Sequence, residues 1–229
     1  MSFIERSTSD LLGTLNDLER AHSPERLFLQ GDPSLLKRGA RVAIVGSRQA
    51  TPAGLERCDR FARMLAEQGI VIVSGLASGI DTAAHRAAIA CGGRTIAVLG
   101  TPLDDAYPKE NAELQAQIAR DHLLVSQFPL GSRVTPRNFP IRNRTMALLC
   151  DATVIIEASQ SSGTRHQGWE ALRLGRVLFL AREVLENPEL TWPAEMMRYG
   201  AQILSEENLE AVAEDLPALG ASVPLARAA

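Results

Sequence analysis

The chain has 229 residues, of which 45% are hydrophobic and 22% are charged, and its formal net charge is −3. These values are typical of one globular domain with a sizeable core and exclude a polycationic protein, so any nucleic-acid binding has to come from a local patch. The three widely spaced cysteines predict free thiols and a cytoplasmic location, and without a leader pattern or an apolar run of membrane-spanning length neither secretion nor membrane insertion is expected.

Helices and strands are predicted from the spacing of apolar residues along the chain. Residues 1–22 predict an amphipathic helix, and residues 27–29 predict a short strand. Further strands are expected at 42–45, 70–73, 95–99, 123–126, 153–156 and 177–180, and helices at 52–68, 80–91, 109–120, 141–149 and 164–175. Residues 188–215 predict a helix, a short strand at 202–204 and a closing helix.

This alternation of strands and helices predicts an α/β fold of the extended Rossmann type. Its sheet is expected to be doubly wound and mostly parallel, with helices on both faces, because the strands are continuous apolar runs. Three segments are expected. Residues 1–38 form a helical or extended segment packed on the sheet edge, residues 39–215 form the Rossmann-like domain, and residues 216–229 form a disordered tail.

Small residues follow four of the predicted strands. Because the carboxyl ends of parallel strands meet at one edge of a sheet, their loops are expected to line one crevice. The candidate ligand-binding residues in these loops are Gly46, Ser47, Arg48, Ser74, Gly75, Ser78, Gly79, Asp81, Gly100, Thr101, Ser162, Gly163 and Thr164. Glycine permits close backbone approach, and hydroxyls and helix N-termini attract anions, so the loops predict an anion or nucleotide site.

Two alternatives remain open for these loops. They could be purely structural turns, and Asp81 could serve only to offset a helix dipole. The Gly-x-Gly-x-x-Gly fingerprint of dinucleotide-binding folds is absent, which disfavours NAD as a ligand.

A second pattern is the absence of acidic residues from His122 to Cys150. The same segment contains Arg133, Arg137, Arg142 and Arg144, together with Phe128 and Phe139. Arginines contact phosphates and aromatic rings stack on unpaired bases, so the segment favours single-stranded nucleic acid as a ligand. The alternative is a solvated loop whose arginines pair with acidic residues elsewhere.

Five motifs occur in a distinctive order along the chain. They are Val42-Ala-Ile-Val-Gly-Ser-Arg48, the segment from Val73 to His85, Thr95-Ile-Ala-Val-Leu-Gly100, Tyr107-Pro-Lys-Glu-Asn111 and Asn138-Phe-Pro-Ile-Arg-Asn-Arg144. Together they resemble the DNA-processing protein A family (DprA, also called Smf). The resemblance implies a basic pocket for single-stranded DNA, a homodimer, and a role in loading the RecA recombinase during natural transformation.

The resemblance also implies roles for single residues. Arg48 is expected to contact DNA phosphate, and Arg142 and Arg144 are expected to shape or line the same pocket. Arg137, Asn138 and Asn143 are further candidates for DNA binding. Family members often carry additional helical and winged-helix domains, so a short form without them is expected.

Residues 157–175 depart from that family and partly resemble the LOG-type phosphoribohydrolases. Those enzymes use a Gly-Gly-x-Gly-Thr-x-x-Glu loop, whereas here Glu170 follows Thr164 by six residues rather than three. Glu157, at the end of a predicted strand, could bind ribose hydroxyls or pair with a nearby arginine.

The sequence therefore predicts a protein that binds single-stranded DNA in DNA processing, uptake or recombination. The alternatives are a sensor or phosphoribohydrolase-like enzyme for a small phosphorylated nucleotide, and a scaffold without a working site. No activated nucleophile, acid–base pair or metal cluster can be identified, so no catalytic residue, metal or cofactor is predicted.

Overall fold

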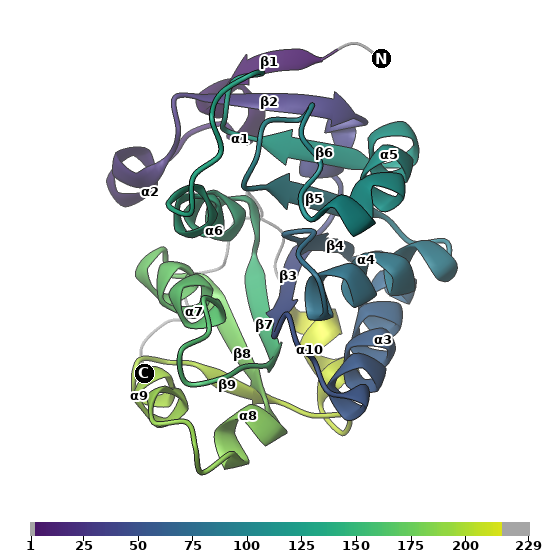
Figure 1. Cartoon of the computed structure of the whole chain (residues 1–229). Helices are drawn as coiled ribbons and strands as arrows, with labels where there is room; N and C mark the ends of the chain where they lie inside the picture. The colour runs from purple at the N-terminus through teal and green to yellow at the C-terminus, as the bar shows by residue number, and fades with distance from the viewer. Residues whose placement is uncertain (1–2, 217–229) are drawn as a thin grey trace.

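A computed structural model describes residues 3–216, which form one nine-stranded sheet covered by helices on both faces (Figure 1). The sheet order is β1-β2-β6-β5-β4-β3-β7-β8-β9. The strands are β1 Ile4–Ser7, β2 Arg26–Gly31, β3 Arg41–Gly46, β4 Val71–Ser74, β5 Thr95–Leu99, β6 Leu123–Ser126, β7 Ala152–Glu157, β8 Val177–Ala181 and β9 Gln202–Leu204. Strands β3 to β9 are parallel and β1 and β2 are antiparallel at one edge, which confirms the predicted Rossmann-like fold.

The helices form two layers around this sheet. They are α1 Thr8–Leu12, α2 Asp17–His22, α3 Pro52–Glu67, α4 Ile80–Ala90, α5 Ala112–Asp121, α6 Asn138–Leu149, α7 Thr164–Arg173, α8 Arg182–Glu186, α9 Trp192–Arg198 and α10 Leu209–Asp215, with 3₁₀ turns η1 Pro33–Leu36 and η2 Lys109–Asn111. Successive residues of β3 show the layering: Val42 and Ile44 pack in the core under α3, α4 and α10, whereas Ala43 packs in the core under α1, α6 and α9. Figure 1 shows α3 and α4 on one side of the sheet and α6 and α7 on the other.

The winding of the chain changes direction at β3. Helix α3 leads from β3 to β4 on one side, and α6 leads from β6 back across to β7 on the other side. Doubly wound sheets bind ligands at such a switch point, outside the carboxyl ends of the strands. The register of the β3–β7 pair shifts between Val45 and Gly46, so that Gly46 lies opposite Glu157.

The single helix predicted over residues 1–22 is wrong. The segment instead forms β1, α1 and α2, because Gly13 has a φ of 77° and ends α1, and Asn16 starts α2 with a reciprocal capping box to Glu19. An ion pair between Glu19 and Arg176 fastens α2 to the loop before β8. Apolar spacing alone did not reveal these breaks, since the apolar residues continue across them.

Other elements differ from prediction mainly at their ends. Helix α6 begins at Asn138 rather than at 141, because Pro140 lies in its first turn, where no backbone N–H needs a helical partner. The predicted helix 109–120 begins as the 3₁₀ turn η2, and α8 was not predicted. Residue 216 is the last described residue, so the tail predicted to be disordered lies otherwise outside the described part of the chain.

The cysteines agree with the expectation of free thiols. Cys58, Cys91 and Cys150 are free thiols; Cys58 and Cys150 are buried and Cys91 is half-buried. Within residues 3–216, no helix is long and apolar enough to cross a bilayer.

A buried histidine on α4 is expected to make the stability of the fold depend on pH. His85 has no exposed surface, and its Nδ1 lies 2.6 Å from Thr95 Oγ1. Burial, aided by the charges of His122 and Arg142, lowers the pKa of His85 from 6.5 to about 3. At pH values between about 3 and 6.5, His85 binds a proton in the unfolded chain but not in the folded chain. The free energy of unfolding is therefore expected to fall as the pH falls, by up to about 1.4 kcal/mol per pH unit from this group.

Urea denaturation at about pH 7 and about pH 4.5 checks this expectation. His85→Asn can keep the contact with Thr95 but cannot take up the proton, so its stability should fall less steeply with acid than that of the wild type. The exposed His166 provides the control, and His166→Asn should retain the wild-type slope. Equal slopes for the wild type and His85→Asn would show that His85 does not cause the acid sensitivity.

Candidate functional site

A cleft of about 660 Å³ opens at the carboxyl ends of β3 and β7, at the switch point of the sheet. It is lined by Val45, Gly46, Ser47, Arg48, Gln49, Ala77, Asp81, Tyr107, Pro136, Phe139, Pro140, Arg142, Asn143, Met146, Ser159, Ser162, Gly163, Thr164, His166 and Gln167. This lining contains two arginines and a histidine but a single carboxylate, that of Asp81. The local charge is therefore positive although the net charge of the chain is negative, which suits an anionic ligand.

Three of the predicted glycines serve close packing between the loops. A Cβ on Gly75 would overlap the guanidinium of Arg142, and a Cβ on Gly100 would overlap the ring of Phe139. Gly79 has a φ of 75°, and a Cβ there would overlap the carbonyl of Ser47. Gly163 differs, because a Cβ there would meet no atom of the described residues within 4 Å, and the backbone at this position is open to the cleft.

Arg142 forms the floor of the cleft rather than its rim. It is 5% exposed, and its Nη1 donates to the carbonyl oxygens of Gly75 at 2.6 Å and Val98 at 2.7 Å. Its Nε donates to Asn143 Oδ1 at 3.0 Å. Burial lowers the pKa of Arg142, and the nearby Asp81 carboxylate opposes that effect. The guanidinium thus fixes the loop after β4 against β5.

Asp81 is the buried counterpart of this arginine. It is 6% exposed, and its Oδ2 accepts a hydrogen bond from the backbone N–H of Ala77 at 3.4 Å. Burial raises the pKa of Asp81, whereas the charge of Arg142 lowers it. Offsetting a helix dipole is thus only part of its role, because the carboxylate also sits beside a buried cation.

Arg48 lies at the exposed rim of the cleft. Its guanidinium carbon is 5.6 Å from the centroid of the Phe139 ring, and that ring lies 5.3 Å from the ring of Tyr107. Among residues 3–216, Arg48 has no acidic partner, and the same holds for the exposed Arg133 and Arg137. Cations without partners next to exposed rings can engage phosphates and unpaired bases.

Arg144 fits the alternative interpretation of the acid-free segment. Its Nε lies 3.5 Å from Glu170 Oε2, and Glu170 also pairs with Arg173 at 2.7 Å. Neither Arg144 nor Glu170 lines the cleft. The two arginines that the resemblance grouped together, Arg142 and Arg144, therefore occupy different environments.

Glu157 lies at the end of β7 but faces away from the main cleft. Its carboxylate accepts hydrogen bonds from Thr51 N at 3.0 Å and Thr51 Oγ1 at 2.5 Å, at the start of α3. It lines a second cavity of about 420 Å³, which shares Ser47, Gln49 and Ser159 with the cleft. The ion pair with an arginine that was considered for Glu157 is not formed among the described residues, where Arg57 pairs with Glu183 instead.

The structure brings about half of the predicted site residues together. Those that line the cleft are Gly46, Ser47, Arg48, Asp81, Arg142, Asn143, Ser162, Gly163 and Thr164. Buried behind its surface are Ser74, Gly75, Gly100, Thr101 and Asn138, and lying close by without lining it are Ser78, Gly79, Arg137, Arg144 and Glu157. Ser74 illustrates why some candidates do not reach the cleft. Its hydroxyl donates to the carbonyl oxygen of Ile44 at 2.6 Å inside the sheet and is not available to a ligand.

Several lining residues escaped prediction as site residues. Tyr107 was contained in a quoted motif, and Ser159 follows a predicted strand, so position in a loop could have indicated both. Gln167, on the first turns of a helix expected to point at the crevice, does line the cleft; it is 1% exposed, and its Oε1 has no hydrogen-bond partner in the described part of the chain. No group of three or more His, Cys, Asp or Glu side chains suited to a metal occurs within residues 3–216.

The family model and the curated relatives that match this chain all belong to one protein family. A family model described as DNA recombination-mediator protein A matches residues 9–217. DNA processing protein DprA of Bacillus subtilis is 34% identical over 85% of this chain, the DprA of Streptococcus pneumoniae 45% over 69%, and protein Smf of Escherichia coli 37% over 82%. The chain spans 65%, 55% and 51% of the lengths of these three relatives, respectively.

Solved structures agree with that result. DNA processing protein A from Streptococcus pneumoniae superposes with a TM-score of 0.80 at 35% identity, over 93% of this chain and 74% of that chain. DNA processing protein A from Helicobacter pylori, whose structure is described as giving insight into a unique single-stranded DNA binding mode, also has a TM-score of 0.80, at 27% identity, over 93% of this chain and 97% of that chain. A molybdenum cofactor binding protein from Rippkaea orientalis, at 20% identity and a TM-score of 0.55, shares the fold alone.

Proposed function

The chain belongs to the DNA recombination-mediator protein A family, and we propose that it binds single-stranded DNA in the cleft at the carboxyl ends of β3 and β7. The observation that carries this proposal is Arg48, an exposed cation without an acidic partner among the described residues, beside the ring of Phe139. The relative from Helicobacter pylori, whose fold covers 93% of this chain, is described by its single-stranded DNA binding mode, which supports the same ligand here.

Phosphate groups would be held by two features of the cleft. Arg48 offers a charge-assisted contact, and the N-terminus of α7 offers the backbone N–H of Gly163, next to the Thr164 N–H, which donates to Ser162 Oγ at 3.1 Å. Exposed Arg133 and Arg137 would extend this contact along the strand. Non-specific electrostatic contacts of this kind make affinity fall with salt and vary little with sequence.

Bases would be held by the aromatic pair. Phe139 is half-buried because its ring packs on Gly100, so the ring is fixed, and Tyr107 is 50% exposed beside it. A fixed ring next to an exposed ring forms a stacking surface for unpaired bases, which a duplex does not present. Single-stranded DNA is therefore preferred to duplex DNA.

A free mononucleotide is the alternative occupant of the cleft, because the same α7 N-terminus could take its phosphate. Phosphoribohydrolase chemistry is disfavoured, since Glu170 pairs with Arg144 and Arg173 outside the cleft. The position of Glu157, which accepts from Thr51, also leaves Asp81 as the single carboxylate among the described residues of the cleft wall.

Fluorescence anisotropy of a labelled single-stranded oligonucleotide tests the proposal. Binding at about 50 mM salt that weakens strongly at about 200 mM, with duplex DNA competing poorly, is the expected result. No binding of the oligonucleotide at about 50 mM salt, together with a rise in Tm on addition of AMP at low millimolar concentration, would instead identify a free nucleotide as the ligand.

A homodimer, a RecA-type recombinase partner and a cytoplasmic location belong to the same proposal. Family membership supports a role in DNA processing. The three free thiols suit a reducing compartment such as the cytoplasm. Size-exclusion chromatography with light scattering tests the dimer, and co-elution with purified RecA tests the recombinase contact.

A further inference from the structure

Helix α3 begins where a doubly wound fold usually receives an anion. It follows β3, the first parallel strand at the switch point, and it runs for 16 residues from Pro52 with Thr51 as its N-cap. Free backbone N–H groups and the helix dipole make such a terminus attractive to phosphate. The first turn of α3 contains no acidic residue of its own. Its positive end is therefore not compensated from within the helix.

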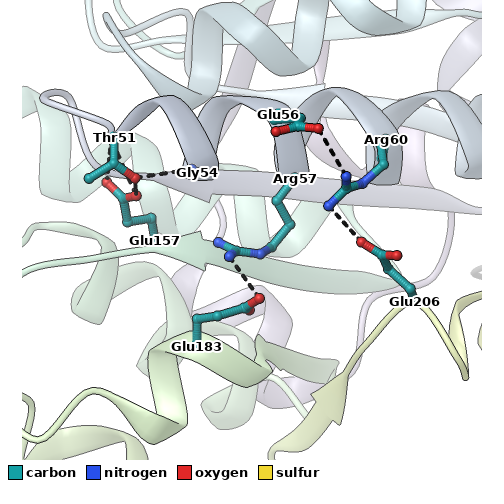
Figure 2. Close-up of polar contacts among 8 residues, drawn as sticks. All are labelled: Thr51, Gly54, Glu56, Arg57, Arg60, Glu157, Glu183 and Glu206. Carbon is teal, nitrogen blue, oxygen red and sulfur yellow. Dashed lines mark hydrogen bonds and ion pairs between the residues drawn. The ribbon is translucent and has the colours of Figure 1, made fainter.

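The carboxylate of Glu157 occupies this place. Oε1 accepts from Thr51 N at 3.0 Å, and Oε2 accepts from Thr51 N at 3.3 Å and from Thr51 Oγ1 at 2.5 Å. Figure 2 shows the Glu157 side chain reaching from β7 to Thr51 at the start of α3. The shifted register opposite Gly46 and the bond from Ser47 N to Glu157 O, at 2.8 Å, hold the backbone that carries this side chain.

Gly54 provides the space for the carboxylate. A Cβ at this position, in the first turn of α3, would overlap Glu157 Oε2. Glycine favours a helix less than alanine does, and the Gly54 N–H donates to Thr51 Oγ1 at 3.0 Å. In phosphate-binding loops, glycine leaves room for a phosphate oxygen at the start of a helix. Gly54 leaves room in the same way, but the oxygen is that of the Glu157 carboxylate.

The two arginines of α3 nearest to its start do not neutralise Glu157. Arg57 pairs with Glu183 at 2.7 Å, and Arg60 pairs with Glu206 at 2.6 Å and Glu56 at 3.2 Å (Figure 2). The partners that the structure gives the Glu157 carboxylate are instead the N–H and hydroxyl of Thr51 at the positive end of α3.

We propose that Glu157 is a built-in anion that excludes the phosphate of a free nucleotide from the α3 side of the site. The second cavity, about 420 Å³ and lined in part by Thr51, Arg57, Glu157 and Glu183, is large enough for a nucleotide phosphate. Because Glu183 is paired with Arg57, the charge of Glu157 is the one that a phosphate would meet. Phosphate binding is thereby confined to Arg48 and the α7 N-terminus in the main cleft. Glu157 is thus a specificity-determining residue that acts against free nucleotides, and this role does not depend on DNA binding.

Binding of inorganic phosphate and of AMP to Glu157→Ala and Glu157→Gln tests the proposal. By isothermal titration and thermal shift, Glu157→Ala should bind both probes at least about tenfold more tightly than the wild type, because the helix terminus becomes free. Glu157→Gln, which removes the charge and keeps the size, should show a smaller gain in the same direction. Glu206→Gln removes one charge from a carboxylate that pairs with Arg60 away from the helix start, so it should bind like the wild type.

Gly54→Ala provides a second, independent measurement. In the wild type it should lower the Tm, because the new methyl group displaces the carboxylate. In the Glu157→Ala background it should leave the Tm unchanged or slightly raised, as alanine favours a helix, and it should abolish the gained phosphate binding. Equal phosphate affinity in the wild type and both Glu157 variants would overturn the proposal, and so would a Gly54→Ala effect on Tm that is the same in both backgrounds.

Discussion

Replacing Arg48 with alanine is expected to weaken the binding of single-stranded DNA by roughly tenfold to a hundredfold at about 50 mM salt. A charge-assisted hydrogen bond to phosphate is worth roughly 1.5–3 kcal/mol, and Arg48 is exposed and has no competing acidic partner among the described residues. Because one phosphate contact disappears, the slope of log K against log salt should also become shallower by about 0.7. Fluorescence anisotropy at several salt concentrations measures both quantities.

Arg120→Ala is the matched control for this experiment. Arg120 is also exposed, but it lies at the end of α5, pairs with Asp121 at 2.8 Å and does not line the cleft. It should therefore leave both affinity and salt slope near the wild-type values. If Arg48→Ala behaved like Arg120→Ala, the DNA would have to bind elsewhere on the surface.

Replacing Arg142 with methionine is expected to lower the free energy of unfolding by about 3–5 kcal/mol. The substitution leaves the carbonyl oxygens of Gly75 and Val98 without their buried donor, and it removes the cation beside Asp81. Leaving two buried carbonyl oxygens without a donor, and a buried carboxylate without its nearby cation, carries a penalty of this size. Urea denaturation near pH 7 measures the loss.

Two comparisons separate this buried role from a surface one. Arg144→Met removes an arginine from the same helix, yet it should cost no more than about 1 kcal/mol, because Arg144 forms a partly exposed ion pair. Asp81→Asn combined with Arg142→Met should be less destabilising than the sum of the two single changes. Strict additivity, or equal costs for Arg142→Met and Arg144→Met, would contradict the arrangement at the floor of the cleft.

The sequence did not predict that Arg142 and Arg144 lie in different environments. Both were expected to shape one pocket because they stand two residues apart in a distinctive motif. On α6 such a spacing turns side chains by roughly 200°, so one points under the loop after β4 and the other toward α7. Which of them is buried depends on Gly75 and Val98, whose carbonyl oxygens accept from Arg142 across 67 and 44 residues of sequence.

The loops at the strand ends also could be predicted only in part from the sequence. Their position at one edge of the sheet was predicted, since parallel strands with crossover helices bring their carboxyl ends together. Residue type did not show which glycines face a ligand. Gly163 opens toward the cleft, whereas the space beside Gly75, Gly79 and Gly100 is occupied by Arg142, Ser47 and Phe139, respectively. Glycine permits close approach, but the sequence does not say whether a ligand or the protein approaches.

The sequence by itself determined the alternating strands and helices from β3 to β8, the parallel Rossmann-like sheet and the edge at which its loops meet, because apolar periodicity and turn residues act over short stretches of chain. Only the tertiary structure decided that Arg142 lies inside, that Arg48 lies beside Phe139, and that Glu157 binds the N-cap residue of α3. The bond between Thr51 and Glu157 joins residues 106 positions apart. The pairing of β3 with β7 brings these distant residues together, and a local pattern of residue types cannot predict that contact.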